Sequence, residues 1–232
     1  MYLDEGFFSN RLRSCSIRRD WLPDKDGENP ESEETGNPDD EKIAEELTEL
    51  QEEPAEAIFY DRYGYVSGAE ADRISQDGFY GTRLDDGRLQ LDPVEMLHLL
   101  ERKRILTRSL TGEQIEARQI VDELMKGDPD LWTRYLVFRD LRSRGYAVRQ
   151  GFGGGIGFRV YARGDRPSAA TASQLVYVLK EGEPISLQDL DMVTEAASAA
   201  RKKLVFALVD QNGEVNFYKV SRATLRNRAG EQ

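Results

Sequence analysis

The clearest chemical pattern in the sequence is a run of glycines at residues 151–157, which reads G-F-G-G-G-I-G. Glycine-rich loops cradle phosphate groups when a helix follows them, because the free N–H groups at a helix N-terminus attract anions. Here the pattern after the run is that of a strand, and no Gly-Lys-Ser/Thr sequence accompanies it. We therefore interpret the run as a flexible connection between two strands, with phosphate binding as the alternative.

Histidine and cysteine chemistry is limited by composition, since the chain has one histidine, His98, and one cysteine, Cys15. A single histidine excludes the common histidine-based zinc sites and any two-histidine catalytic scheme, so we expect no metal and no cofactor. His98 has no partner nearby in sequence, which favours a packed histidine over a catalytic one. The single cysteine excludes an internal disulfide and is typical of the cytoplasm.

The charge of the chain is unevenly distributed. The net charge is −11, but residues 21–57 hold 15 Asp/Glu and two Lys, while residues 130–232 hold 16 Lys/Arg and 11 Asp/Glu. The acidic, proline-containing stretch is typical of a solvated linker, and mimicry of RNA beside a basic domain is the alternative. The basic C-terminal part can meet phosphate. No apolar run is long enough to cross a membrane, and we expect no membrane partner.

The elements that must position any site follow from periodicity and turn signals. Before residue 110 we expect strands at 57–60 and 89–91, and helices at 69–76 and from Pro93 to residues 101–104, the latter containing His98. After residue 110 we expect helices from 113 to 125 and from 130 to 145, strands at 146–149, 158–161 and 175–179, a helix at 187–202, and strands at 204–209 and 214–220. Asp210-Gln211-Asn212-Gly213 is the expected hairpin turn between the last two strands.

This order of elements predicts an α+β fold in which a small N-terminal α/β domain precedes a C-terminal domain with a mixed sheet. We expect three regions: an N-terminal segment with the acidic linker at 1–54, the small domain at 55–110, and the mixed-sheet domain at 111–228.

Three segments of the C-terminal half carry a family likeness. They are Trp132-Thr-Arg-Tyr-Leu-Val-Phe-Arg-Asp-Leu-Arg-Ser-Arg-Gly-Tyr146, Phe158-Arg-Val-Tyr-Ala-Arg-Gly164 and Ala200-Arg-Lys-Lys-Leu-Val-Phe-Ala-Leu-Val-Asp210. In this order and spacing they resemble the catalytic domain of archaeal tRNA-splicing endonucleases, the tRNA-intron lyases. Gly78-Phe-Tyr-Gly81 and residues 89–104 resemble the small N-terminal domain of that family. The resemblance covers residues 55–225 and implies an endonuclease-like C-terminal domain.

The resemblance implies metal-independent cleavage of introns from precursor tRNA at bulged splice sites. The 2′-hydroxyl attacks the phosphorus and the 5′-oxygen leaves, giving 2′,3′-cyclic phosphate and 5′-hydroxyl ends. By position, Tyr161 matches the general base and Lys202 the cation that stabilises the transition state. Phenols ordinarily have a pKa near 10, so a cation such as Lys202 or Arg159 is needed beside the base. The expected RNA-binding side chains are Arg159, Arg163, Arg201 and Arg222.

The sequence departs from the family at two positions of this site. The family's histidine is expected in a pattern like His-Ser-x-x-Leu-Val, whereas this chain has Thr171-Ala-Ser-Gln-Leu-Val176. A threonine hydroxyl cannot act as a general acid near neutral pH, and such an acid contributes about 100- to 10,000-fold in rate. The family's RNA-clamping arginine is expected seven residues before the lysine, where this chain has Glu195.

Three functional hypotheses follow. The first is an active splicing endonuclease with a substituted acid, and the second is a non-catalytic structural subunit that supports a catalytic partner. The third is an interaction module that does not bind RNA, in which Tyr161 and Lys202 are an ordinary strand tyrosine and helix-end lysine. The resemblance also implies a homo- or hetero-oligomer with like or catalytic subunits, held by the final strand and by an acidic hairpin that enters a basic pocket of another subunit.

Overall fold

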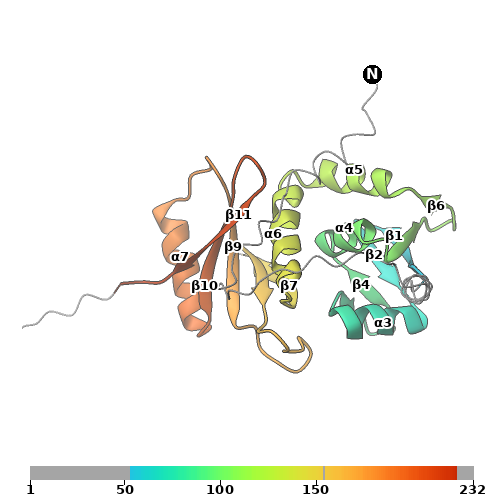
Figure 1. The fold of residues 1–232 in the computed structure, drawn as a ribbon, viewed down its shortest axis with the longest axis horizontal. Helices are drawn as coiled ribbons and strands as arrows, with labels where there is room; N and C mark the ends of the chain where they lie inside the picture. The colour runs from blue at the N-terminus through green and yellow to red at the C-terminus, as the bar shows by residue number, and fades with distance from the viewer. Residues whose placement is uncertain (1–52, 154, 224–232) are drawn as a thin grey trace, which may run out of the picture. The chain divides into compact units, whose positions relative to one another are not determined.

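The structure is a computed structural model that describes residues 53–153 and 155–223. The predicted N-terminal segment and acidic linker lie, up to residue 52, outside the described residues. From Glu53 onward the chain forms one compact unit. This unit contains two sheets with helices between and around them (Figure 1). The predicted α+β fold class is confirmed, whereas the predicted domain boundaries stay predictions.

The first sheet has six strands in the order β3-β4-β2-β1-β5-β6. β1 pairs with β2 in an antiparallel hairpin and with β5 in parallel. Its residues alternate between buried and exposed, so one face of the sheet packs inward. The elements are β1 (Ala55–Tyr60), β2 (Tyr63–Val66), α3 (Gly68–Gly78), β3 (Thr82–Arg83), β4 (Leu89–Leu91), α4 (Pro93–Glu101), β5 (Ile105–Arg108) and β6 (Gln114–Ile115).

The second sheet has five strands in the order β11-β10-β9-β8-β7, of which only β9 and β10 pair in parallel. α7 and α6 lie on its two faces (Figure 1). Leu204 and Phe206 of β10 pack with Val193 of α7, while Ala207 and Val209 belong to the cluster with α6, which explains the nearly continuous apolar sequence of β10. The elements are α5 (Ala117–Gly127), α6 (Leu131–Ser143), β7 (Val148–Gly153), β8 (Ile156–Val160), β9 (Gln174–Lys180), α7 (Leu187–Ala199), β10 (Lys203–Val209) and β11 (Val215–Val220).

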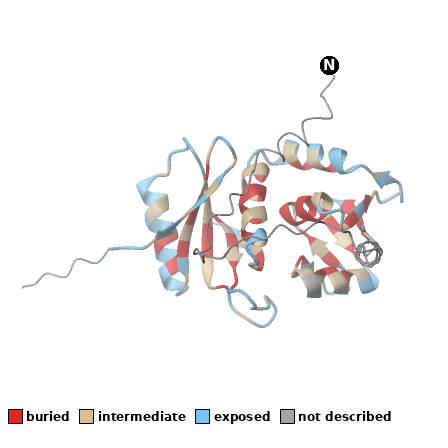
Figure 2. Ribbon diagram, in the orientation of Figure 1, coloured by how far each residue is buried: buried red, intermediate tan, exposed pale blue. Residues whose placement is uncertain are grey.

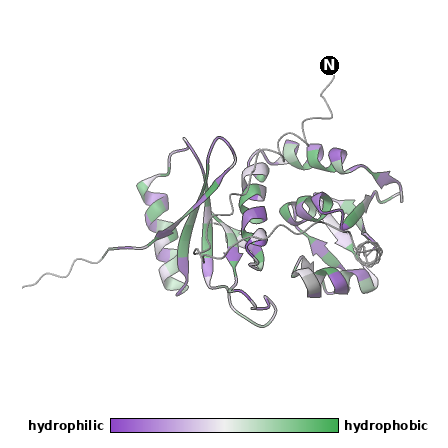
Figure 3. Cartoon of the chain, viewed as in Figure 1, coloured by the Kyte–Doolittle hydropathy of each residue, from purple (hydrophilic) through white to green (hydrophobic). Residues whose placement is uncertain are grey.

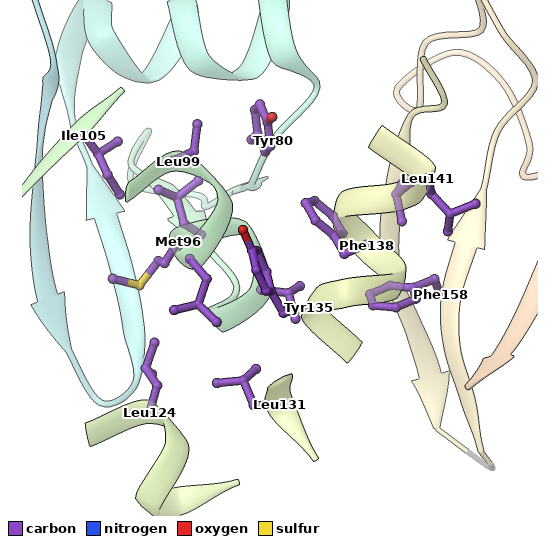
Figure 4. Packing of buried hydrophobic residues seen from close by; sticks show 14 of the residues in the cluster. Tyr80, Met96, Leu99, Ile105, Leu124, Leu131, Tyr135, Phe138, Leu141 and Phe158 are labelled. Atoms are coloured by element: carbon purple, nitrogen blue, oxygen red, sulfur yellow. The ribbon is translucent and has the colours of Figure 1, made fainter. Parts of the chain in front are cut away.

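One large apolar cluster joins the two sheets, and α6 is at its centre. Phe138 of α6 meets Phe158 of β8 with ring centroids 5.9 Å apart (Figure 4). On its other side α6 packs against α4, and the Tyr135 hydroxyl donates to the Glu101 carboxylate. Buried residues and hydrophobic residues both concentrate on these facing surfaces (Figures 2 and 3). The N-terminal elements are therefore fixed to the C-terminal sheet through α6.

Helix α4 begins with a complete capping box. The Glu95 carboxylate is 2% exposed and accepts the N–H groups of Gly81 and Asp92, each at 3.0 Å. Arg149 of β7 lies 3.5 Å from it. Burial and the neighbouring Asp92 raise the pKa of Glu95 to about 7, despite the opposing effect of Arg149. This carboxyl therefore titrates in the physiological range.

We expect Glu95→Gln to change the pH dependence of stability. Because the folded pKa lies above the ordinary value of 4.5, ionisation of Glu95 destabilises the wild type as pH rises from 4.5 to 7. The free energy of unfolding of the variant should therefore rise by about 3 kcal/mol relative to that of the wild type between pH 5 and pH 8. Urea unfolding at both pH values measures this change. The control is Glu56→Gln, since the exposed Glu56 has a pKa lowered by its hydrogen bond to Arg108 and should show no change over this interval. If the free energies of unfolding of the variant and the wild type differ by the same amount at pH 5 and at pH 8, the account is contradicted.

Three expectations about local structure are wrong. The glycine run is not a loose connection, because β7 continues to Gly153 and β8 begins at Ile156. A β-carbon at Gly151 would collide with the carbonyl oxygen of Ile156, which explains a glycine there. The helix expected to reach residue 202 ends at Ala199, because Arg201 adopts φ 55. The helix expected from residue 113 begins at Ala117, because Gln114 and its neighbour form β6.

Within the described residues, no helix is both long enough and apolar enough to cross a lipid bilayer.

Candidate active site

The candidate site lies at the end of the second sheet, where β8 stops. Tyr161 directly follows β8, and its N–H donates to the Ala147 carbonyl at 3.0 Å. On the other side, the Ser173 N–H donates to the Val160 carbonyl at 2.9 Å. The backbone leading into β7 and the backbone leading into β9 therefore hold Tyr161 in place.

Lys202 reaches the same place from the loop between α7 and β10. The Lys202 N–H closes the last turn of α7 by donating to the Ala197 carbonyl at 2.9 Å. Its ammonium Nζ donates to the carbonyl of Ala172 at 2.6 Å. Ala172 in turn packs with Tyr161 in a small buried cluster. The fold thus brings the predicted base and the predicted cation to one shared residue from separate strand ends.

Tyr161 is 5% exposed and has Ala147, Ala172 and Phe79 among its neighbours. The Tyr161 hydroxyl forms no hydrogen bond with any of the described residues. Apolar contacts therefore fix the ring, and no described side chain competes for the hydroxyl.

Thr171 and Glu195, the two positions where the sequence departs from the family, are both exposed. Thr171 adjoins Ala172 in the chain and so stands beside the residue that Tyr161 and Lys202 share. Glu195 lies on α7, whose last residues lead to Lys202. Thr171 therefore adjoins the Tyr161 cluster in the chain, whereas Glu195 lies on α7, seven residues before Lys202.

The four arginines proposed to bind RNA lie in different parts of the fold, three of them with contacts of their own. Arg159 donates from Nε to the Gln150 carbonyl at 2.9 Å. Arg163 lies over the Tyr146 ring with its guanidinium carbon 5.1 Å from the centroid. Arg222 pairs with Asp191 of α7. Arg201 is exposed, next to Lys202 in the chain.

One residue of the site was missed by sequence reasoning. Phe79 packs against the Tyr161 cluster although it belongs to the N-terminal sheet region, where it caps α3. It adopts φ 55, an uncommon conformation for an aromatic residue. The glycine before it marks a helix end, but no sequence signal connects Phe79 with a tyrosine in another domain.

The glycine run lines a separate cavity of about 510 Å³. Arg62, Arg134 and the N-terminus of α4 also line it, so a helix end does face the run, although from elsewhere in the chain. The Asp92 carboxylate already caps this helix end, and both arginines pair with Asp128. An incoming phosphate would meet Asp92, so this geometry does not favour the alternative interpretation of the run.

No cluster of three or more His, Cys, Asp or Glu side chains suited to a metal ion occurs within residues 53–153 and 155–223.

Comparison with known proteins finds two family models that match successive parts of the chain. Residues 131–217 match the family model described as tRNA intron endonuclease, catalytic C-terminal domain, and residues 55–121 match that for the N-terminal domain. The chain therefore belongs to the tRNA-splicing endonuclease family, as the resemblance predicted.

Individual relatives support this membership. The chain is 33% identical over 150 residues to the tRNA-splicing endonuclease of Methanothermobacter thermautotrophicus, a match covering 65% of this chain and 86% of that protein. It is 36% identical over 168 residues to that of Thermococcus gammatolerans, covering 67% and 95%. For the relative from Methanococcoides burtonii, 34% identical over 155 residues, the match covers 67% of this chain but 43% of that longer protein.

Proposed function

We propose that this chain is a subunit of a tRNA-splicing endonuclease that cleaves introns from precursor tRNA in the cytoplasm. The observation that carries the proposal is the meeting of Tyr161 and Lys202 at Ala172. A phenol and an ammonium that both lie at Ala172 are a pair that can act on one RNA phosphate. The relatives' names agree with this assignment.

In the proposed reaction, Tyr161 removes the proton from the 2′-hydroxyl next to the scissile bond. The ammonium of Lys202 turns from the Ala172 carbonyl toward the phosphate and stabilises the extra negative charge of the transition state. The 2′-oxygen bonds to phosphorus as the bond to the 5′-oxygen breaks. The products are a 2′,3′-cyclic phosphate and, after a proton reaches the leaving oxygen, a 5′-hydroxyl.

The source of the proton for the leaving oxygen distinguishes an active endonuclease subunit from a structural one. Thr171 cannot supply it near neutral pH, so an active chain needs water or a group from a partner. Glu195 places a negative charge where an RNA-clamping cation is expected. These two departures are the observation behind the alternative role, a structural subunit that positions RNA for a catalytic partner.

The proposal includes assembly with a like or catalytic subunit. β11 is the edge strand of the second sheet, with Tyr218 54% exposed, and can pair with an equivalent strand. The hairpin between β10 and β11 carries Asp210 and Glu214. The resemblance implies that this hairpin enters a basic pocket of the other subunit.

Cleavage of an intron-containing precursor tRNA by the purified chain, with EDTA present, tests the proposal. We expect the intron to be released with 2′,3′-cyclic phosphate and 5′-hydroxyl ends. A matched substrate with a 2′-deoxy nucleotide before each splice site should bind equally and stay intact, because its attacking oxygen is missing.

Cleavage that appears only after a catalytic family member is added would assign the structural role. Inhibition by EDTA, or cutting of the 2′-deoxy substrate, would contradict the proposed chemistry. If binding to the RNA does not weaken as salt increases, the chain makes no phosphate contacts and is an interaction module instead.

A further inference from the structure

A second, smaller cavity of about 170 Å³ lies between α3, α4 and α6. It is lined by Gly78 and Tyr80 after α3, by His98 and Arg102 of the α4 region, by Arg104, and by Arg142 of α6. Ligand pockets for whole small molecules usually measure about 300–1,000 Å³. This one suits a single ion or one chemical group.

Among the described side chains that line the cavity, three are arginines and none is acidic. Arg142 donates to the carbonyls of Gly78 at 2.6 Å and Tyr146 at 3.2 Å, and its guanidinium lies over the Tyr80 ring. These contacts fix its orientation without neutralising its charge. Neither Arg142 nor Arg102 forms an ion pair with another described residue. Within the described part of the chain, these two guanidinium groups therefore line the cavity without a carboxylate partner.

His98 is a polar side chain in the wall of this cavity. It is 5% exposed, and its Nδ1 has no hydrogen-bond partner among the described residues. The Glu101 carboxylate lies 3.9 Å from Nδ1, and the rings of Tyr80 and Phe138 flank the imidazole. Buried polar atoms in proteins are paired in the great majority of cases. The imidazole therefore has hydrogen-bonding capacity that the described residues do not use.

The cavity adjoins the candidate active site. Gly78 and Tyr80 line it, while Phe79 between them packs into the Tyr161 cluster. Arg142 holds this segment through the Gly78 carbonyl, and its second acceptor, Tyr146, lies under the guanidinium of Arg163. The cavity and Tyr161 are thus on opposite sides of one short segment.

We propose that this cavity binds a phosphate group of the RNA backbone close to the phosphate that is cleaved, held by Arg102, Arg142 and His98. The inference rests on the proposed function. Arginine suits this ligand because its planar fork matches phosphate oxygens, and Arg142 retains N–H donors beyond those given to the two carbonyls. His98 completes the site, since its imidazole N–H can donate to a phosphate oxygen.

The single histidine makes the site directly measurable by NMR. Burial and the charges of Arg142, Arg102 and Arg139 lower the pKa of His98 to about 4. A bound phosphate would offset these charges, so the His98 ring proton should shift saturably with inorganic phosphate, and its pKa should rise. Chloride at the same ionic strength, and acetate as a carboxylate, should give no saturable shift.

The matched variants are Arg102→Ala and Arg88→Ala, both at exposed arginines in the N-terminal part of the chain. Arg102→Ala should abolish the phosphate response of His98, whereas Arg88→Ala should retain it. A wild type that shows no phosphate response would overturn the proposal. An equal response to acetate would also overturn it, by indicating a carboxylate of a protein partner.

The RNA part is tested by binding of precursor tRNA. Arg102→Ala should weaken binding about 5- to 10-fold. It should also reduce the slope of log Kd against log salt by about one, the change expected when one phosphate contact is lost. Suppose that Arg102→Ala has an unchanged Kd for precursor tRNA while His98 of the wild type still responds to phosphate. The cavity would then bind free inorganic anions and not the RNA backbone, which overturns the RNA assignment. Tyr161→Phe should leave this binding intact. A wild type that binds phosphate normally but cleaves no precursor tRNA, alone or with a catalytic family member, rejects the proposed function but not the pocket.

Discussion

Replacement of Tyr161 by phenylalanine is expected to lower the single-turnover rate of precursor-tRNA cleavage by about 100- to 10,000-fold, the range typical of lost general base catalysis. The change removes only the hydroxyl, which makes no hydrogen bond within the described part of the chain. The ring contacts with Ala172 and Phe79 stay. Stability and RNA affinity should therefore be close to those of the wild type.

The control for this prediction is Tyr177→Phe in β9, a tyrosine of the same sheet that packs against Phe206 rather than Ala172. It should cleave at the wild-type rate. Both variants are compared in the assembly in which the wild type is active, by rapid-quench kinetics with enzyme in excess. Equal rates for Tyr161→Phe and the wild type would remove Tyr161 from the chemistry.

Restoring the family's residues at the two departures should raise activity. We expect Thr171→His with Glu195→Arg to increase cleavage by up to about 100- to 10,000-fold, because a histidine with an ordinary pKa near 6.5 can protonate the leaving oxygen. Thr171 is exposed next to Ala172, so an imidazole has room there. Arginine at position 195 adds a cation in place of a charge that repels phosphate.

The single variants separate the two effects. Thr171→His alone should raise the rate constant at saturating enzyme, whereas Glu195→Arg alone should mainly tighten RNA binding. The gain from Thr171→His should fall again at high pH as the new histidine loses its proton. If the double variant cleaves no faster than the wild type, the positions assigned to the missing acid and clamp are wrong.

Much of the C-terminal sheet could be predicted from sequence because its signals are local. The apolar run of β10, the Asn212-Gly213 turn and the alternation in β11 each specify an element, and the structure places the strands within one residue of the predicted bounds. Gly145 likewise marks the end of α6 with φ 82. These features depend on residues close in the chain, which is why one sequence suffices.

Other parts depend on distant contacts and could not be predicted. β2 contains Gly64, and its place in the sheet follows from pairing with β1 and β4. The parallel partner of β1 is β5, a strand of four residues without a distinctive pattern. The approach of Lys202 to Ala172, the packing of Phe79 on Tyr161 and the arginine-lined cavity around His98 all arise from segments that meet only after folding.

The central claim is that Tyr161 and Lys202 act together on one phosphate, and a double-mutant cycle tests it most directly. Single-turnover rates would be compared for the wild type, Tyr161→Phe, Lys202→Met and the double variant, with Lys203→Met as the control for a neighbouring exposed lysine. Groups that act as a unit are strongly non-additive. We predict that the double variant cleaves about as slowly as the slower single variant. Fully multiplicative losses, or a wild-type rate in either single variant, would contradict a shared site.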